Sequence, residues 1–254
     1  MSDWIWALIF GFVLDLLLGD PSWLYHPVCL IGKYISWMEK KLRRRGGNLR
    51  KSAVFLTAST VLLTMAVVAL ILMLCGLLGR IPPLIAMALL DWMGIAITSM
   101  AKEARGVEKA LGQGVAAGRT QVARIVGRDT QELSEEEIIK ATVETVSENT
   151  TDGVISPLLY AAIGGPILLW GFKAASTLDS MVGYLDEKYR DIGWSSARLD
   201  DVLNYIPARL TALLMVIASY LIGLDGKNAF RIVRRDHANH KSPNCAWSES
   251  AAAG

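Results

Sequence analysis

The sequence predicts an all-α, polytopic membrane protein with about five membrane segments. Apolar residues make up 52% of its 254 residues and the mean hydropathy is +0.35, which is high for a soluble domain. Charged residues still account for 20%, and they cluster between apolar blocks, as in membrane proteins whose loops carry function. No stretch reads as a run of strands. We therefore expect a single integral membrane domain over residues 1–254, with a polar cytoplasmic segment at 101–153.

The first three membrane segments differ in the acids they carry. Ala53–Leu78 has 26 residues and no charge; as a helix it would extend about 39 Å, enough to cross a hydrocarbon core of about 30 Å with some tilt. Trp4–Leu18 and Pro82–Met100 contain Asp15 and Asp91. An aspartate at mid-membrane costs about 2.5–3.5 kcal/mol on insertion scales, so each should face protein or water. Asp91 is either a partner for a group inside the bundle or a functional acid.

Charge asymmetry orients the first half of the chain. The loop 33–51 carries eight Lys or Arg and one acid, which places it in the cytoplasm. Two spans later the chain returns, so Ala101–Asp152 is cytoplasmic.

The second half allows more than one topology. Val154–Phe172 is interrupted by Ser156-Pro157 and by Gly164-Gly165-Pro166, so it is one kinked span or a broken, re-entrant pair of half-helices. Tyr205–Gly223 is the last expected span, and the basic tail after it favours the cytoplasm.

The polar segment ends in a helix rich in acids. Ser134 and Glu137 form a capping box at its start, and Ile139, Val143 and Val146 form an apolar stripe. On another side Glu144, Glu148 and Asp152 recur every four residues. Carboxylates in such a row repel one another by a few tenths of a kcal/mol per pair. A site for a hard cation or phosphate and a solvated helix end both remain open from the spacing alone.

Other chemistry-bearing residues are isolated. His26 before Pro27 is a general base or an interfacial histidine. Arg231, Arg234 and Arg235 cluster on a helix, where they either grip phosphate or anchor the tail inside. No glycine-rich nucleotide loop of a standard kind occurs, and a net charge of +2 gives no argument for nucleic acid. We also expect no cleaved leader, because the first residues carry an acid in place of a basic region.

Six stretches, in order and spanning nearly the whole chain, resemble one family, the adenosylcobinamide-phosphate synthases of cobalamin biosynthesis, or CobD/CbiB-type membrane proteins. They are DLLLGDPSWLYHPVCLI (15–31), IVGRDT (125–130), ETVSENTTDGVISP (144–157), STLDSMVGY (176–184), DDVLNYIPAR (200–209) and RRDHANHKSPNCAW (234–247). Any one of them is a weak signal, whereas six collinear stretches are specific.

The resemblance implies an ATP-dependent acid–amine ligase. A carboxylate of adenosylcobyric acid would be joined to the amine of aminopropanol phosphate or ethanolamine phosphate, with ATP as a substrate and Mg²⁺ as the metal. It further implies a multi-pass protein of the inner, cytoplasmic membrane with its active site facing the cytoplasm. The expected partners are the two substrates, the lipid bilayer, and either a second copy of the chain or other cobalamin-pathway membrane enzymes, with no nucleic acid.

The resemblance also implies roles for individual residues. Metal binding falls to Glu144, Glu148, Asp152 and Asp179. Phosphate contacts fall to Arg128, Arg234 and Arg235, and substrate orientation falls to Asn149, Ser242 and Asn244. In catalysis, Glu148 and Asp152 would act beside His26 or His237, which would assist proton transfer from the amine.

Two departures and two rival functions accompany this interpretation. Family members usually extend past Gly254, so a C-terminal region of the family is expected to be missing, and Ser248 and Ser250 stand where Pro and Ala are more usual. An ion-coupled membrane transporter is the first alternative, because Asp15 and Asp91 lie in apolar segments. A non-catalytic scaffold for cobalamin enzymes is the second.

Overall fold

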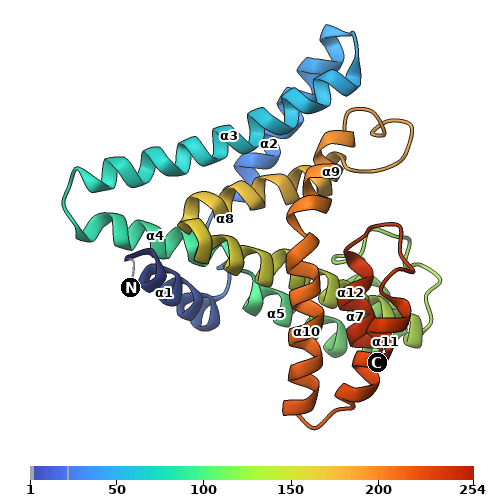
Figure 1. The fold of residues 1–254 in the computed structure, drawn as a ribbon. Helices are drawn as coiled ribbons and strands as arrows, with labels where there is room; N and C mark the ends of the chain where they lie inside the picture. Colours follow the sequence, from blue (N-terminus) through green and yellow to red (C-terminus); the bar gives the residue numbers. More distant parts are fainter. Residues whose placement is uncertain (1–2, 22) are drawn as a thin grey trace. The chain divides into compact units, whose positions relative to one another are not determined.

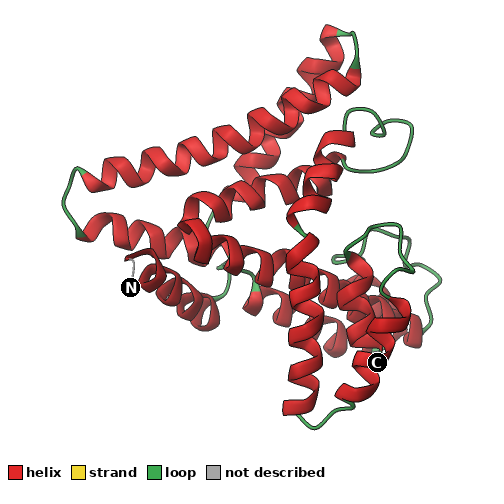
Figure 2. Ribbon diagram, viewed as in Figure 1, coloured by secondary structure: helices red, strands yellow, loops and turns green. Residues whose placement is uncertain are grey.

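The computed structural model describes residues 3–21 and 23–254, and in that part of the chain every regular element is a helix (Figures 1 and 2). The predicted all-α fold is confirmed. The elements are α1 (Asp3–Leu18), α2 (Pro27–Arg45), α3 (Leu49–Gly76), α4 (Ile81–Gly94), α5 (Ile97–Leu111), α6 (Val115–Val122), α7 (Glu135–Thr150), the π-helical turn η1 (Thr151–Ile155), α8 (Ser156–Val182), α9 (Trp194–Leu203), α10 (Tyr205–Leu221), α11 (Gly226–Asp236) and α12 (Cys245–Ala253).

Three helical stretches are long and apolar enough to cross a membrane: Leu49–Gly76, Ile81–Leu111 and Glu135–Val182. A fourth is added if α9 and α10, which are broken at Asn204, form one span. The 16 residues of α1 amount to about 24 Å of helix, which is shorter than the hydrocarbon core. Within residues 3–21 and 23–254, three or four helices thus have the length and composition of membrane-spanning helices.

The chain folds into two compact units. The first unit comprises Met1–Ile95 and Ser156–Asn204, and the second unit comprises Ala96–Ile155 and Tyr205–Gly254.

In the first unit, α1 packs closely on α4. Gly11 makes the approach possible, because a Cβ at this position would lie 2.8 Å from both Ala88 O and Asp91 Cβ. Asp15 and Asp91 are both 0% exposed, so the expectation that these acids face protein is confirmed. Three ring N–H groups then tie the region to backbone carbonyls: Trp92 to Gly19 (3.0 Å), Trp170 to Leu90 (3.0 Å) and His26 to Met93 (2.8 Å).

One expected feature of the first half of the chain is wrong, and a second is confirmed with an interruption. The segment 33–51 is not a loop, since most of it lies in α2 and at the start of α3, and Asn48 caps α3 through Lys51 N–H (3.1 Å). Pro82–Met100, expected as a membrane segment, lies within the apolar stretch Ile81–Leu111 that is long enough to span, but its helix is interrupted. α4 ends at Gly94, and Ile95 is extended with φ −102° and ψ 145°. The Ala96 N–H then donates to the Gly153 carbonyl (3.0 Å), a tertiary contact that replaces helical continuation.

Of the two breaks expected around α8, the one at Gly164-Gly165-Pro166 is confirmed and the one at Ser156-Pro157 is not. Gly164 and Gly165 do leave helical geometry, and Gly165 has φ +64°, a conformation that only glycine adopts without strain. Pro157, in contrast, lies inside the continuous helical stretch Glu135–Val182. The Gly153 carbonyl, four residues before it, accepts from the Ala96 N–H in place of the N–H that proline lacks. The irregularity before it is instead the π-helical turn η1.

The second unit has two apolar clusters. Val107, Val122, Ile138 and Ala141 join α5, α6 and α7, while Ala212, Val216, Ala229, Val233 and Ala251 join α10, α11 and α12. The predicted capping box at Ser134 and Glu137 is present. The predicted apolar stripe of α7 does not face this core: Ile139 and Val143 are 49% and 45% exposed. The helix packs through the neighbouring face that carries Ile138 and Ala141.

Candidate active site

The acidic row of α7 runs to the end of that helix and into η1. Glu144 and Glu148 are one turn apart on α7, and Asp152 belongs to the π-helical turn. A π-helical turn holds more residues than an α-helical one, so Asp152, although four residues after Glu148, does not lie directly in line with Glu144 and Glu148. Such turns occur frequently at functional sites.

Glu144 and Glu148 line a polar pocket of about 270 Å³ that is formed within the second unit. α7 also contributes Thr145 and Asn149, and α12 contributes Glu249. The segment after α6 completes the lining of the pocket with Ile125, Val126, Gly127 and Arg128. Four of the residues that the sequence assigned to the site, Arg128, Glu144, Glu148 and Asn149, are thus brought together.

Arg128 supplies the positive charge of this pocket. Its guanidinium donates to Glu144 Oε2 at 2.9 Å, and the two side chains are 55% and 53% exposed. An ion pair so exposed contributes less than about 1 kcal/mol. Arg128 can therefore exchange the carboxylate for an incoming phosphate at small cost, and a planar guanidinium suits phosphate oxygens.

Glu148 is held by a hydrogen bond that the sequence gave no reason to expect. The Cys245 thiol donates to Glu148 Oε1 at 3.1 Å, and Ser242 is hydrogen-bonded to the same thiol. Burial, then the neighbouring Glu148 carboxylate, hold the pKa of Cys245 well above its usual range. The thiol therefore stays protonated and keeps its donor role. Through it, the predicted Ser242 is connected to Glu148.

Glu249 is the acid that sequence reasoning missed. It lines the pocket from α12, and burial raises the pKa of its carboxyl, with Glu148 and Glu144 adding to the rise. Cys245 and Glu249 are four residues apart in a helix and so share one face. That four-residue spacing was the signal available in the sequence for a shared face of Cys245 and Glu249.

The donors of this pocket suit a hard cation in chemistry, though they form no complete coordination shell. Glu144, Glu148 and Glu249 offer only carboxylate oxygens, the ligands that Mg²⁺ accepts, and their mutual repulsion would be relieved by a cation. Among residues 3–21 and 23–254, no group of three or more His, Cys, Asp or Glu is already arranged to hold a metal. A bound Mg²⁺ would thus take further ligands from water and phosphate, as it usually does.

Two further predicted residues, His237 and Asn244, lie beside Arg209 and the rings of Tyr205 and Trp247. Arg209 lies 3.5 Å from the centroid of Tyr205 and 4.6 Å from that of Trp247, and the ring of His237 lies 4.4 Å from Trp247. Arg209 also donates to Asn244 Oδ1 (3.5 Å). His237 Nδ1 is 2.9 Å from the Val233 carbonyl, so one ring nitrogen is already engaged.

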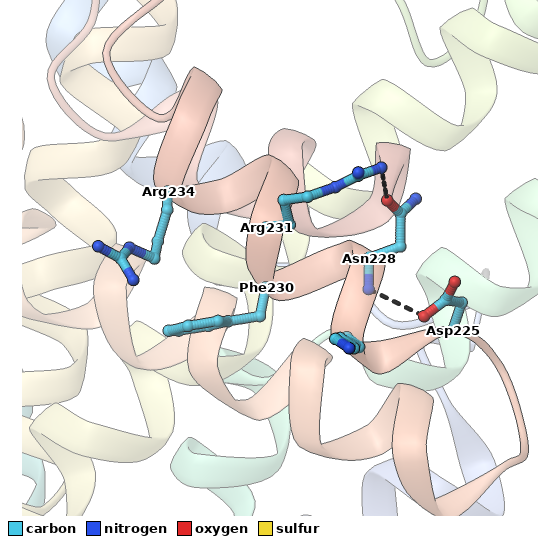
Figure 3. A pocket seen from close by; sticks show the side chains of 6 residues that line it. Asp225, Asn228, Phe230, Arg231 and Arg234 are labelled. Carbon is cyan, nitrogen blue, oxygen red and sulfur yellow. Dashed lines mark hydrogen bonds between the residues drawn. The ribbon is translucent and has the colours of Figure 1, made fainter.

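Arg234 and Arg235 do not line the acidic pocket. Arg234 lines a separate depression of about 500 Å³ on α11, shown in Figure 3. Arg235 is paired with Asp236 through two hydrogen bonds of 2.8 and 2.6 Å.

His26 and Asp179 belong to the first unit. Asp179 is on α8, where its carboxylate lies against Gly183. His26 precedes α2 as its N-cap: Nδ1 accepts from Val28 N–H at 3.2 Å, and Nε2 is 2.8 Å from the Met93 carbonyl. Burial lowers the pKa of His26. Proton transfer by this ring would require one of those two contacts to break.

Comparison with known proteins identifies the relatives of this chain. Residues 8–254 match the family model described as CobD/Cbib protein. The chain is 51% identical over 249 residues to "Cobalamin biosynthesis protein CobD" of Pelobacter propionicus, covering 98% of this chain and 77% of that protein. It is 48% identical to the protein of the same name from Listeria monocytogenes serotype 4b, over 96% of this chain and 78% of the relative.

A third relative carries the other family name. "Cobalamin biosynthesis protein CbiB" of Salmonella arizonae is 44% identical over 98% of this chain and 80% of its own length. No solved structure matches. Identity of this size over nearly the whole chain settles the family, and with it a role in cobalamin biosynthesis: the chain belongs to the CobD/CbiB family.

Proposed function

We propose that this protein is an ATP-dependent ligase that joins adenosylcobyric acid to aminopropanol phosphate or ethanolamine phosphate, giving adenosylcobinamide phosphate. The acidic pocket of the second unit is its reaction site, and we place that pocket on the cytoplasmic side of the inner membrane, where ATP is available. The observation that carries the proposal is the meeting of Arg128, Glu144, Glu148 and Glu249 in one polar pocket.

The reaction would proceed in two steps. A carboxylate oxygen of the corrinoid attacks the γ-phosphorus of ATP, and ADP leaves. The amine nitrogen then attacks the acyl carbon, inorganic phosphate leaves, and the nitrogen loses a proton. Both steps place negative charge near the transferring phosphoryl group, so fixed positive charge close to it lowers the barrier.

The residues of the pocket divide these tasks. Arg128 releases Glu144 and binds phosphate oxygens. Glu148, fixed by the Cys245 thiol, and Glu249 would hold Mg²⁺, which would supply neutralisation of phosphate charge. Asn149 at the rim offers an amide for orienting the amino-alcohol phosphate.

The pocket size also fits small anionic groups. Its volume of about 270 Å³ is close to the lower limit of about 300 Å³ for ligand pockets. A phosphate with a short amino alcohol can enter it, whereas a corrinoid ring is far larger. We infer that only the carboxylate arm of the corrinoid reaches the pocket.

The test is Glu148→Gln in purified protein reconstituted into vesicles. ADP and amide formation should fall by about 100-fold or more, because the carboxylate charge is lost while the shape is kept. Membrane insertion and the thermal midpoint should be retained, and Glu132→Gln, an exposed acid after the pocket segment, serves as the matched control. Full activity of Glu148→Gln would remove this residue from the site.

The same preparation separates the ligase from its rivals. A ligase forms the amide and ADP only when the carboxylate and amine substrates are both present. Ion flux into the vesicles that does not require a corrinoid would instead support a transporter. Absence of ATP consumption with both substrates present would support a scaffold.

A further inference from the structure

α11 carries a basic and aromatic face that the acidic pocket does not use. Lys227, Phe230, Arg231 and Arg234 recur at i, i+3, i+4 and i+7, and all four side chains are exposed. They line the depression of about 500 Å³ drawn in Figure 3. The opposite face of the helix, with Ala229 and Val233, is buried against the core formed with α10 and α12. We call these four residues the α11 face.

No carboxylate neutralises the α11 face. In the part of the chain that the structure describes, none of its three cations forms an ion pair, whereas the adjacent Arg235 is paired with Asp236. Asp225, the acid beside the face, caps the helix by accepting from Asn228 N–H (2.9 Å). Arg231 turns toward Asn228 Oδ1, as Figure 3 shows. The Arg234 guanidinium carbon lies 5.9 Å from the ring centroid of Phe230. Three positive charges are thus available to an outside partner.

The α11 face lies next to the end of an apolar helix. The Leu224 N–H donates to the Ser219 carbonyl at 2.8 Å, which ties the turn before α11 to the last turn of α10. Gly226 starts α11 against the ring of Tyr220, since a Cβ there would lie 2.6 Å from Tyr220 Cδ2. Leu221 and Ile222 beside it are 81% and 71% exposed. Leu224 in the same turn is 64% exposed, so the basic face of α11 starts beside an exposed apolar turn that can enter the surface of a bilayer.

We propose that the α11 face binds the phosphates of anionic phospholipids at the membrane surface. Guanidinium groups donate parallel hydrogen bonds to phosphate oxygens, and Phe230 is placed to enter the boundary between headgroups and acyl chains. A free anion would explain the cations but would gain nothing from the exposed ring or the apolar turn. Binding of lipid here does not depend on the ligation proposed above, because the residues that line the two pockets are different.

The experiment titrates the purified full chain, in neutral detergent, with phosphatidylglycerol that carries a fluorescent acyl chain. Energy transfer from the native tryptophans reports binding. The triple variant Lys227→Gln, Arg231→Gln, Arg234→Gln should bind about 100-fold more weakly at low salt, since each basic residue near an anionic surface contributes about fivefold. Phe230→Ala should weaken binding by less, and fluorescent phosphatidylcholine should not distinguish the variants.

The matched control removes three exposed cations at similar helical spacing from α5, in Lys102→Gln, Arg105→Gln, Lys109→Gln. Its affinity for phosphatidylglycerol should stay within about threefold of the unaltered chain, after allowance for general screening. Equal losses in both triple variants would overturn the proposal, since net charge alone would then explain binding. Displacement of the lipid by millimolar inorganic phosphate would also overturn it, in favour of a free-anion site. Unchanged thermal midpoints establish that the exposed substitutions leave the fold intact.

Discussion

The two units of this protein place their acids in opposite surroundings. In the first unit, Asp15 and Asp91 are 0% exposed inside an apolar helical bundle. In the second unit, Glu144, Glu148 and Glu249 line a pocket open to solvent and facing an arginine. The comparison suggests that an acid in an apolar segment of this fold is a packing feature, while acids at the end of a helix beside a polar segment are available for chemistry.

Asp91 illustrates the first kind of acid. In the described residues neither of its carboxylate oxygens has a hydrogen-bond partner, and its Cβ lies where α1 approaches α4 at Gly11. Burial of a polar group without a partner costs roughly 2–7 kcal/mol depending on the reference state. The first unit therefore tolerates this acid through close packing, and its substitution should change stability more than chemistry.

Among the tests that compare the two units, the largest expected effect is on the activity of Glu249→Gln. Loss of the third carboxylate from the pocket should lower the rate of ligation about 10- to 100-fold and raise the Mg²⁺ concentration needed for half-maximal rate. Asp91→Asn, the corresponding change in the first unit, should keep the rate within about twofold. Steady-state kinetics of both variants in vesicles provides the measurement. If Asp91→Asn were the more damaging change, the assignment of chemistry to the second unit alone would be wrong.

Gly11→Ala should show the reverse pattern, a loss of stability. The new methyl group would meet Ala88 O and Asp91 Cβ at 2.8 Å, and overpacking of this kind costs about 1–3 kcal/mol. The thermal midpoint in detergent should fall by on the order of 5 °C, with the specific activity of the folded fraction retained. Gly76→Ala in α3 is the control, because a Cβ there meets nothing within 4 Å. An unchanged midpoint for Gly11→Ala would show that α1 and α4 are less tightly packed than described.

Cys245 offers a smaller and more specific test of the pocket. Cys245→Ala removes the donor to Glu148 and should lower activity by about tenfold, which corresponds to the lower end, about 1.5 kcal/mol, of the range for a hydrogen bond to a charged group. Cys245→Ser keeps a donor and should recover most of that loss. Cys75→Ala, a thiol on α3 in the first unit, should have no effect. If the serine and alanine variants were equally impaired, packing and not the hydrogen bond would be the role of Cys245.

The smallest expected effect is on the pH dependence of stability. The pKa of Glu249 is raised by burial and by Glu148, so the folded state holds this proton more firmly than the unfolded chain does. Stability should therefore fall as pH rises from about 4.3, where an unperturbed glutamate titrates, through the raised pKa. Glu249→Gln should lack this decline. Millimolar Mg²⁺ should cancel it in the unaltered protein, and thermal midpoints across this range with and without Mg²⁺ measure both effects.

Sequence patterns predict the helices well where the cause is local. The charge-free run Ala53–Leu78 lies largely within α3, the Ser134–Glu137 capping box marks the start of α7, and Gly164-Gly165 breaks α8. The break at Ile95 was not predictable, because a contact distant in sequence causes it: the Ala96 N–H bonds the Gly153 carbonyl. The burial of Ile138 in place of Ile139 also depends on tertiary packing.

The site was predictable in part for a similar reason. Arg128, Glu144, Glu148 and Asn149 were inferred from motifs, and the fold brings them into one pocket. Cys245 and Glu249 were missed because their importance arises from the packing of α12 near α7, about one hundred residues apart in sequence. The roles given to Asp179, His26 and Arg234 remain predictions, and Arg234 lines a different depression of the second unit.

Both ring nitrogens of His26, the residue before Pro27, are engaged in hydrogen bonds to the backbone. Since Nδ1 accepts from Val28, the ring proton must reside on Nε2, where it reaches the last turn of α4. The His26 ring thus links the first turn of α2 to the last turn of α4, and these two hydrogen bonds determine its tautomer. A second ring proton, added at low pH, would occupy Nδ1 and break the bond from Val28 N–H, so the link between the two helices requires a neutral imidazole.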